Sequence, residues 1–273
     1  MKIATNIYFV IFFSFLSTNL SKAEILFKDR EDIAKYTFKM DCPNKESESI
    51  KIKYLCALKG IGKEETKLSF DTMKMLASEN VSDAKYSLYT TREITGLDQK
   101  TAIFYLEEAA KDGLPAAQLR MAEIYQSGEE DVQQDYKLAF FWLEKAASNG
   151  EHTAMRRIAK YYFSGTAVKK DLKRGFNWIN KLYIDSGRDF DDWGLLGTIY
   201  EEGIGTEINL TKAYMCYDIE GTAGIEEKAR IAPKMTAEQR AEGLRLSHEW
   251  QEKNHVYTMQ YLGLSRQSEG SYR

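Results

Sequence analysis

The feature that most constrains the fold is a near-repeat of twelve residues. "AIFYLEEAAKDG" covers residues 102–113 and "AFFWLEKAASNG" covers 139–150, so the second copy follows the first by 37 positions. Recurrence at a period of about 20–50 residues is typical of stacked repeat proteins, in which each unit buries a face of its neighbour. The sequence therefore predicts a solenoid and not a core built around one pocket.

Five units align on this period. The three clearest each carry a glycine after their first apolar stretch, at Gly128, Gly165 and Gly203. A degenerate copy precedes these three, and a weaker one precedes that. In chain order the units are residues 53–80, 83–113, 116–150, 152–187 and 191–224.

Apolar periodicity predicts two short helices in each unit and an all-α fold. Apolar or small residues recur at i, i+4, i+5 and i+8 in the first segment of a unit, which makes one helical stripe. The three glycines suit left-handed C-terminal caps, and Asp135 and Asp171 are candidate N-caps of second helices. Most of the aromatic residues are expected in the core, among them Tyr125, Trp142, Tyr162, Trp178 and Tyr200.

The segment after the last unit departs from the repeat. Thr236, followed by Gln239, is a helix-start pattern, and the run to Trp250 predicts a closing helix. A solenoid needs such a cap because its last hairpin would otherwise expose an apolar face. The expected organisation is an N-terminal segment over 24–48, a capped α-solenoid over 49–250 and a polar tail over 251–273, of which residues 262–273 are expected to be frayed.

The pattern A-x-x-x-[LIM]-[AG]-x-x-Y-x-x-G, a polar connector and a helix ending A-A-x-x-G resembles the Sel1-like repeat, a relative of the tetratricopeptide repeat. Residues 117–128 with 139–150 match it best, whereas the next unit ends "KLYIDSG" without the double alanine. The likeness is clear over about 83–250 and weaker over 49–82. It implies a right-handed superhelix that serves as an adaptor or binding surface.

The N-terminus has the layout of a secretory signal peptide. Lys2 is followed by an apolar run over 7–16, and Ser21 and Ala23 fit the small positions before a cleavage site at Glu24. The apolar run is too short to span a bilayer comfortably, so removal is favoured over anchoring. We expect an exported chain, residues 24–273, in a bacterial periplasm or secreted, with no stable membrane anchor.

Export bears on the three cysteines, Cys42, Cys56 and Cys216. In an oxidising compartment a Cys42–Cys56 disulfide is expected, because it would close a short loop and pin the N-terminal element. Cys216 lies among helical residues in "AYMCYDIE" and is predicted to be a small buried hydrophobic residue.

Composition and motifs argue against several functions. Loss of the signal peptide changes the formal net charge from −3 to −5, and such a surface has no electrostatic reason to bind nucleic acid or anionic lipid. "GIGKEETK" at 60–67 lacks phosphate-loop spacing, and His248 and His255 have no third ligand candidate. Carboxylate pairs such as Glu201–Glu202 fall at helix ends, where solvated charge is ordinary. No catalytic residue, cofactor or metal is expected.

The candidate binding residues lie on the surface of the predicted first helices. Positions that avoid the apolar stripe carry polar side chains, and first helices usually line the concave side of such superhelices. These residues would form a charged protein-binding groove, although a simple solvated face explains the pattern equally well. If the groove binds a partner, charge reversal at Arg157 and Lys160 weakens capture and leaves melting unchanged. The six candidate positions are Arg120, Glu123, Arg157, Lys160, Thr198 and Glu202.

Three function classes follow. The leading hypothesis is a non-enzymatic binding protein. The resemblance makes this hypothesis more specific: several periplasmic Sel1-like proteins are immunity proteins against toxic effectors, including phospholipases delivered by type VI secretion, so an immunity role is expected here. The second class is a periplasmic regulator of a membrane sensor, or a secreted factor that engages a host protein. The third is an enzyme, which the resemblance disfavours: the Sel1-like proteins reported to handle β-lactams carry a pair of cysteines in each repeat, whereas this chain has three in all.

Overall fold

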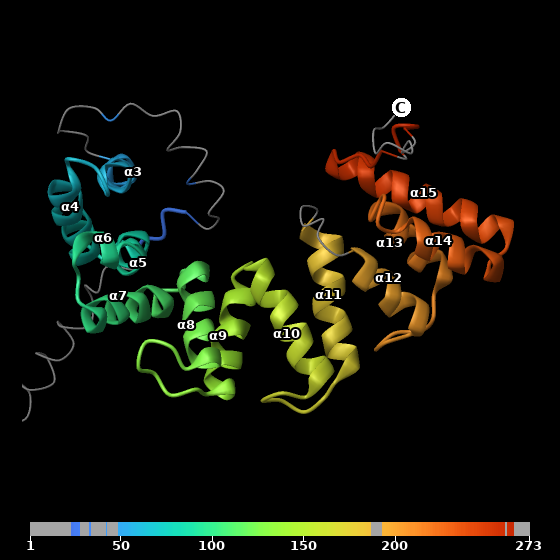
Figure 1. The fold of residues 1–273 in the computed structure, drawn as a ribbon, viewed down its shortest axis with the longest axis horizontal. Helices are drawn as coiled ribbons and strands as arrows, with labels where there is room; N and C mark the ends of the chain where they lie inside the picture. Colours follow the sequence, from blue (N-terminus) through green and yellow to red (C-terminus); the bar gives the residue numbers. More distant parts are fainter. Residues whose placement is uncertain are drawn as a thin grey trace, which may run out of the picture. The chain divides into compact units, whose positions relative to one another are not determined.

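The computed structural model describes residues 23–27, 33, 42, 49–186, 193–259 and 261–264. All but the last residue of the expected signal peptide, and residues 265–273 of the expected tail, lie outside these ranges. Every named element in the described part is a helix, which confirms the all-α prediction (Figure 1). The chain forms two compact units, Met1–Met121 (unit 1) and Ala122–Arg273 (unit 2), which are described separately below.

Unit 1 contains the first two predicted hairpins. Helices α3 and α4 form the hairpin whose sequence matches the repeat pattern least well, and α5 packs against α7 in the next hairpin. The short α6 was not expected; it interrupts this second hairpin and ends at Gly96 in the left-handed conformation. The helices are α3 (Ile50–Gly60), α4 (Thr66–Ser78), α5 (Ser82–Thr90), α6 (Arg92–Thr95) and α7 (Gln99–Lys111).

Unit 2 contains the remaining hairpins and the closing helix. Consecutive helices from α9 to α13 pack on one another, and α15 packs along α13. The boundary between the units falls within α8 (Pro115–Ser127). The other helices are α9 (Tyr136–Ser148), α10 (His152–Ser164), α11 (Leu172–Ser186), α12 (Trp193–Glu202), α13 (Leu210–Ile219), α14 (Ile225–Ile231), η1 (Ala232–Lys234) and α15 (Ala237–Asn254).

Local signals set the ends of these helices as predicted. The carboxylate of Asp135 accepts hydrogen bonds from the backbone N–H groups of Lys137 and Leu138, at 2.8 and 3.0 Å. The carboxylate of Asp171 accepts one from Arg174 N at 2.9 Å. Both are therefore N-caps, since they satisfy donors that the first turn of a helix leaves unpaired.

The three repeat glycines end their helices in the left-handed region, with φ of 75° at Gly128, 79° at Gly165 and 72° at Gly203. Glycine is favoured there because a Cβ would strain this backbone conformation. The chain then passes through a connector to the next helix. We define the connectors as residues 128–135, 165–171 and 203–209.

Each connector is fixed to its first helix by the same backbone hydrogen bond. The last connector residue donates its N–H to the carbonyl of the repeat tyrosine, with N···O distances of 2.8–2.9 Å. The connectors are therefore closed by the same main-chain contact in three successive hairpins, although their lengths and the positions of their other positive-φ residues differ. The donor–acceptor pairs are Asp135 to Tyr125, Asp171 to Tyr162 and Asn209 to Tyr200.

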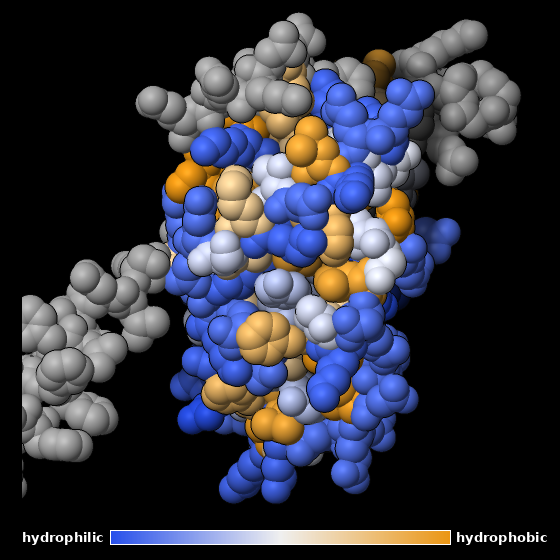
Figure 2. All heavy atoms as spheres, turned by 90° about the vertical axis from the view of Figure 1, so that its left-hand side faces the viewer, coloured by the Kyte–Doolittle hydropathy of each residue, from blue (hydrophilic) through white to orange (hydrophobic). Residues whose placement is uncertain are grey.

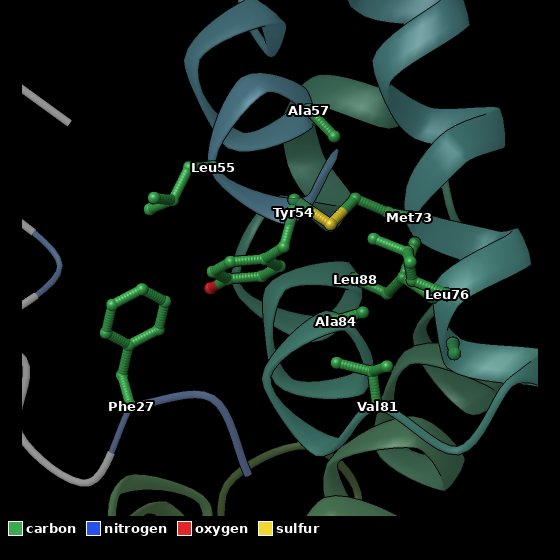
Figure 3. Packing of buried hydrophobic residues seen from close by; sticks show 10 residues of the cluster. Phe27, Tyr54, Leu55, Ala57, Met73, Leu76, Val81, Ala84 and Leu88 are labelled. Carbon is green, nitrogen blue, oxygen red and sulfur yellow. The ribbon is translucent and has the colours of Figure 1, made fainter. Parts of the chain in front are cut away.

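The core of unit 1 includes a segment near the N-terminus. Figure 3 shows Phe27 approaching Tyr54, whose ring centroid lies 6.0 Å away. Glu24 forms a parallel bridge to Val81, and Leu26 N donates to the buried carboxylate of Asp83 at 2.6 Å. Residues 24–27 thus pack against α3 and the start of α5.

In unit 2 the predicted stripe is largely buried. Trp142, Tyr162 and Tyr200 lie in the core, whereas Tyr125 and Trp178 are only half-buried. A small residue permits close approach of α12 and α13: a Cβ at Gly197 would lie 2.5 Å from the ring of Tyr217. The other residues of the stripe are also buried: Ala122, Ala139, Ala146, Ala154, Ile158, Ala159, Leu182 and Leu196 in unit 2, and Met121 at the end of unit 1.

The closing helix begins as predicted and ends later. Thr236 and Gln239 form a reciprocal capping box at its start. The helix continues four residues beyond Trp250, and part of the expected tail packs against it: the Tyr261 hydroxyl donates to Glu252 at 2.9 Å, and the Tyr261 ring lies 4.9 Å from that of His248. The first part of the expected polar tail thus continues α15, and Tyr261 contacts this helix through its ring and its hydroxyl.

Candidate protein-binding surface

In unit 2, two of the predicted surface residues pair with each other. Arg157 on α10 donates to the carboxylate of Glu123 on α8, at 2.9 Å, and each side chain is about one-third exposed (34% and 31%). Lys160, one turn further along α10, is exposed. Charge reversal at Arg157 would place a second carboxylate beside Glu123 and lower the stability. The expectation that melting stays unchanged therefore applies to a variant at Lys160 and not to one at Arg157.

The α12 positions differ from one another. The Thr198 hydroxyl lies 3.4 Å from the Tyr217 hydroxyl, and Glu202 is exposed. We call Glu123, Arg157, Lys160, Thr198 and Glu202 the first-helix face of unit 2. Arg120 does not join it, because Arg120 belongs to unit 1, where its Nε donates to the Tyr89 hydroxyl at 2.7 Å.

Glu201 was not among the six candidate binding residues, yet its carboxylate contacts three side chains. Its carboxylate, 11% exposed, accepts hydrogen bonds from the Arg230 guanidinium and, at 2.9 Å, from the Tyr217 hydroxyl. Lys234 lies 3.8 Å away. The Arg230 hydrogen bond is the main cause that lowers the pKa of Glu201 below its ordinary value. The description of Glu201–Glu202 as an ordinary solvated pair is therefore wrong for Glu201.

A second network lies deeper, beneath α15. Asp218 on α13 is 4% exposed and forms an ion pair with Lys228 of α14. The Ser247 hydroxyl donates to the other oxygen of Asp218 at 2.7 Å, and Gln251 Nε2 donates to Ser247 Oγ at 2.9 Å. These bonds connect α13, α14 and α15 through polar groups that are buried except for the partly exposed Lys228, so they support structure and not chemistry.

The cysteines have two different environments. Cys42 and Cys56 form a disulfide, with their Cα atoms 5.6 Å apart. Cys216 is buried, as predicted, and burial raises the pKa of its thiol far above the ordinary value. A thiol of this kind stays protonated and is a poor nucleophile.

The described residues offer little for catalysis. They contain no group of three or more His, Cys, Asp or Glu side chains that could hold a metal ion. Burial raises the pKa of Asp83 to about 6, but this carboxylate is 3% exposed and accepts the Leu26 N–H, so a substrate has no access to it. None of the helices in the described ranges combines the length and apolar character of a membrane-spanning segment.

Stacked helical hairpins with regular connectors define an all-α solenoid. The Sel1 repeat matches four segments, residues 91–114, 115–151, 152–183 and 195–219, so these hairpins are similar to Sel1 repeats. The α3–α4 hairpin precedes the first matched segment. Sel1 repeats are protein-interaction scaffolds, and the arrangement here is consistent with a binding scaffold.

Two solved structures share this fold. One is a protective antigen of uropathogenic Escherichia coli that displays an SLR fold; it is 20% identical, with a TM-score of 0.58 over 80% of this chain and 51% of its own. The present chain thus spans about half of that protein. The other is a Sel1 repeat protein from Oxalobacter formigenes, 22% identical, with a TM-score of 0.55 over 75% of this chain and 86% of its own. Comparison with curated proteins gives no significant match.

Proposed function

We propose that the chain is an exported, non-enzymatic scaffold that binds another protein, and that it acts as an immunity protein that neutralises a toxic effector in the periplasm. The effector would be an enzyme such as a phospholipase. The observation that carries the proposal is the succession of Sel1-like hairpins in residues 91–219, each of which presents its own set of exposed side chains. Such a framework can cover the active site of a folded enzyme without chemistry of its own.

Two further features support export. Residues 1–23 have the composition of a signal peptide, and the Cys42–Cys56 disulfide suits an oxidising compartment. Residues 24–27, directly after the expected cleavage site, have a defined place in unit 1, so cleavage there would leave the fold intact.

The binding test uses the mature chain, residues 24–273, as bait in periplasmic extract, followed by mass spectrometry. The proposal expects one dominant partner, retained at physiological salt. Variants K160E and E202K change exposed residues of the first-helix face and should reduce capture without a change in melting temperature, whereas K253E on α15 should match wild type.

The biological test is protection. Cells that express a toxin encoded beside this gene should survive when the chain is exported and die when residues 1–23 are deleted. If no neighbouring toxin is neutralised and deletion of the gene instead alters membrane signalling or host contact, the immunity role is excluded in favour of a regulator or a host-interaction factor.

A further inference from the structure

The first two connectors of unit 2 share the features at their two ends and differ in charge. Each follows a glycine cap and ends in the backbone hydrogen bond to a repeat tyrosine. The first connector carries four acidic residues, of which Glu129 and Asp131 are exposed. The second carries exposed Lys169 and Lys170, and Lys173 is exposed in the first turn of α11. Packing does not dictate these charges, because the side chains point to solvent.

The two connectors lie at the same side of unit 2. Figure 1 shows the green connector before α9 and the yellow-green connector before α11 along its lower edge. The ion pair between Glu123 and Arg157 is consistent with this, since it places α8 and α10, the helices that lead into the two connectors, beside each other. We call residues 128–135 and 165–174 the connector edge.

The positive charge in the second half of this edge is not neutralised locally. Within the described part of the chain, Lys169, Lys170 and Lys173 form no side-chain ion pair. Arg174 lies 3.5 Å from Asp171, the one carboxylate in the stretch, and that carboxylate also caps α11. Three free lysines within five residues thus stand out on a chain whose net charge is −3.

We propose that the connector edge is a docking surface for an acidic segment of a protein partner, bound by Lys169, Lys170 and Lys173. This inference rests on the proposed function and adds the chemistry of the partner and a surface distinct from the first-helix face. Loops held on a rigid scaffold are suited to recognition, because little ordering is needed on binding.

The adjacent acidic connector favours a protein over a continuous polyanion. Glu129 and Asp131 would repel the phosphates of a nucleic acid that extends along the edge, whereas a folded protein can place carboxylates opposite the lysines and neutral or basic groups opposite the acids. The same arrangement of charges fixes the orientation of the partner, since a partner docked in the reverse direction would meet like charges at both connectors.

The test measures binding of a short fluorescein-labelled, glutamate-rich peptide to the mature chain by fluorescence anisotropy at low salt. Wild type should bind, binding should weaken as salt is raised, and K169E/K170E should weaken it by about tenfold or more. The control K63E/K253E makes the same charge change at exposed residues that do not belong to the connector edge, and it should behave as wild type. Circular dichroism and melting should show that both variants fold.

Three outcomes would overturn the inference: no peptide binding by wild type, equal binding by K169E/K170E, or tighter binding of oligothymidine than of the peptide. These results are independent of partner capture. If capture succeeds and K169E/K170E captures normally, the docking surface is wrong and the scaffold function stands; if capture fails while the peptide result holds, the proposed function is at fault.

Discussion

Replacement of Asp218 by alanine should strongly destabilise unit 2. The variant leaves the fully buried Ser247 hydroxyl without its acceptor and leaves the Lys228 ammonium, 18% exposed, without its counter-ion. Removal of one partner from a buried ion pair costs about 3–5 kcal/mol, and an orphaned buried donor costs about 1–3 kcal/mol. Because Lys228 retains some access to water, we expect a total loss near the lower end, about 3–4 kcal/mol.

Two further variants separate charge from shape. D218N keeps an oxygen acceptor of the same size, so it should lose only about 1–2 kcal/mol. E226A removes an exposed carboxylate from α14, next to the network but outside it, and should change the unfolding free energy by less than about 0.5 kcal/mol.

The assay is urea unfolding of the mature chain followed by tryptophan fluorescence. Trp193 and Trp250 are buried, with their rings 4.7 Å apart, so their emission reports the packing of α15 against the hairpins. A loss below about 1 kcal/mol for D218A would show that the network contributes little, and the view that polar bonds hold the closing helix would have to be abandoned.

Three more predictions concern other parts of the chain. An acid whose pKa is raised by folding binds its proton more tightly in the folded state, so the stability of the protein rises as pH falls. Because folding raises the pKa of Asp83 from 3.8 to about 6, the unfolding free energy of wild type should increase by about 2 kcal/mol relative to D83N between pH 7 and pH 4.5, measured by urea titration. A difference that does not change with pH would contradict this. C56S opens a disulfide with a sequence separation of 14 and should lower the unfolding free energy by about 3 kcal/mol, an effect that dithiothreitol should reproduce in wild type and not in the variant. G197A should lower the stability measured in thermal melts by about 1–3 kcal/mol, because its Cβ would meet the Tyr217 ring. G194A should be tolerated, because the nearest atom to a Cβ at that position lies 3.7 Å away. Equal melting temperatures of the two variants would refute the argument that α12 and α13 need a glycine at 197.

Local signals were enough to predict the repeat architecture. The caps at Asp135, Asp171 and Thr236 and the glycine at Gly165 depend only on neighbouring backbone groups, so the sequence near each of them specifies the helix end. The period of about 37 residues then follows, because two short helices and two turns fill one unit. The short α6 escaped prediction because the second unit departs from this pattern.

The networks depend on residues far apart in the chain and could not be predicted in the same way. Asp218 and Ser247 are 29 positions apart, and Glu201 and Arg230 are also 29 apart. Nothing in their immediate surroundings identifies the partner. One signal was present for Asp218, a carboxylate inside the otherwise apolar stretch "AYMCYDIE", since a buried charge requires a counter-ion. The pairing of Glu123 with Arg157 likewise depends on the distance between successive first helices, which the period alone does not give.

The hydrogen bonds that close the connectors use only main-chain atoms, from Asp135, Asp171 and Asn209 to three tyrosine carbonyls. Side chains can therefore be exchanged with little change in stability at connector positions that have negative φ and no side-chain hydrogen bond to the hairpin, which leaves out Glu130, Asp131, Gln134, Thr166 and Ala167. Gene duplicates of such an array can diverge in ligand preference while they keep one fold, and a library randomised at positions 132, 133 and 168–170 should yield new binders that still fold.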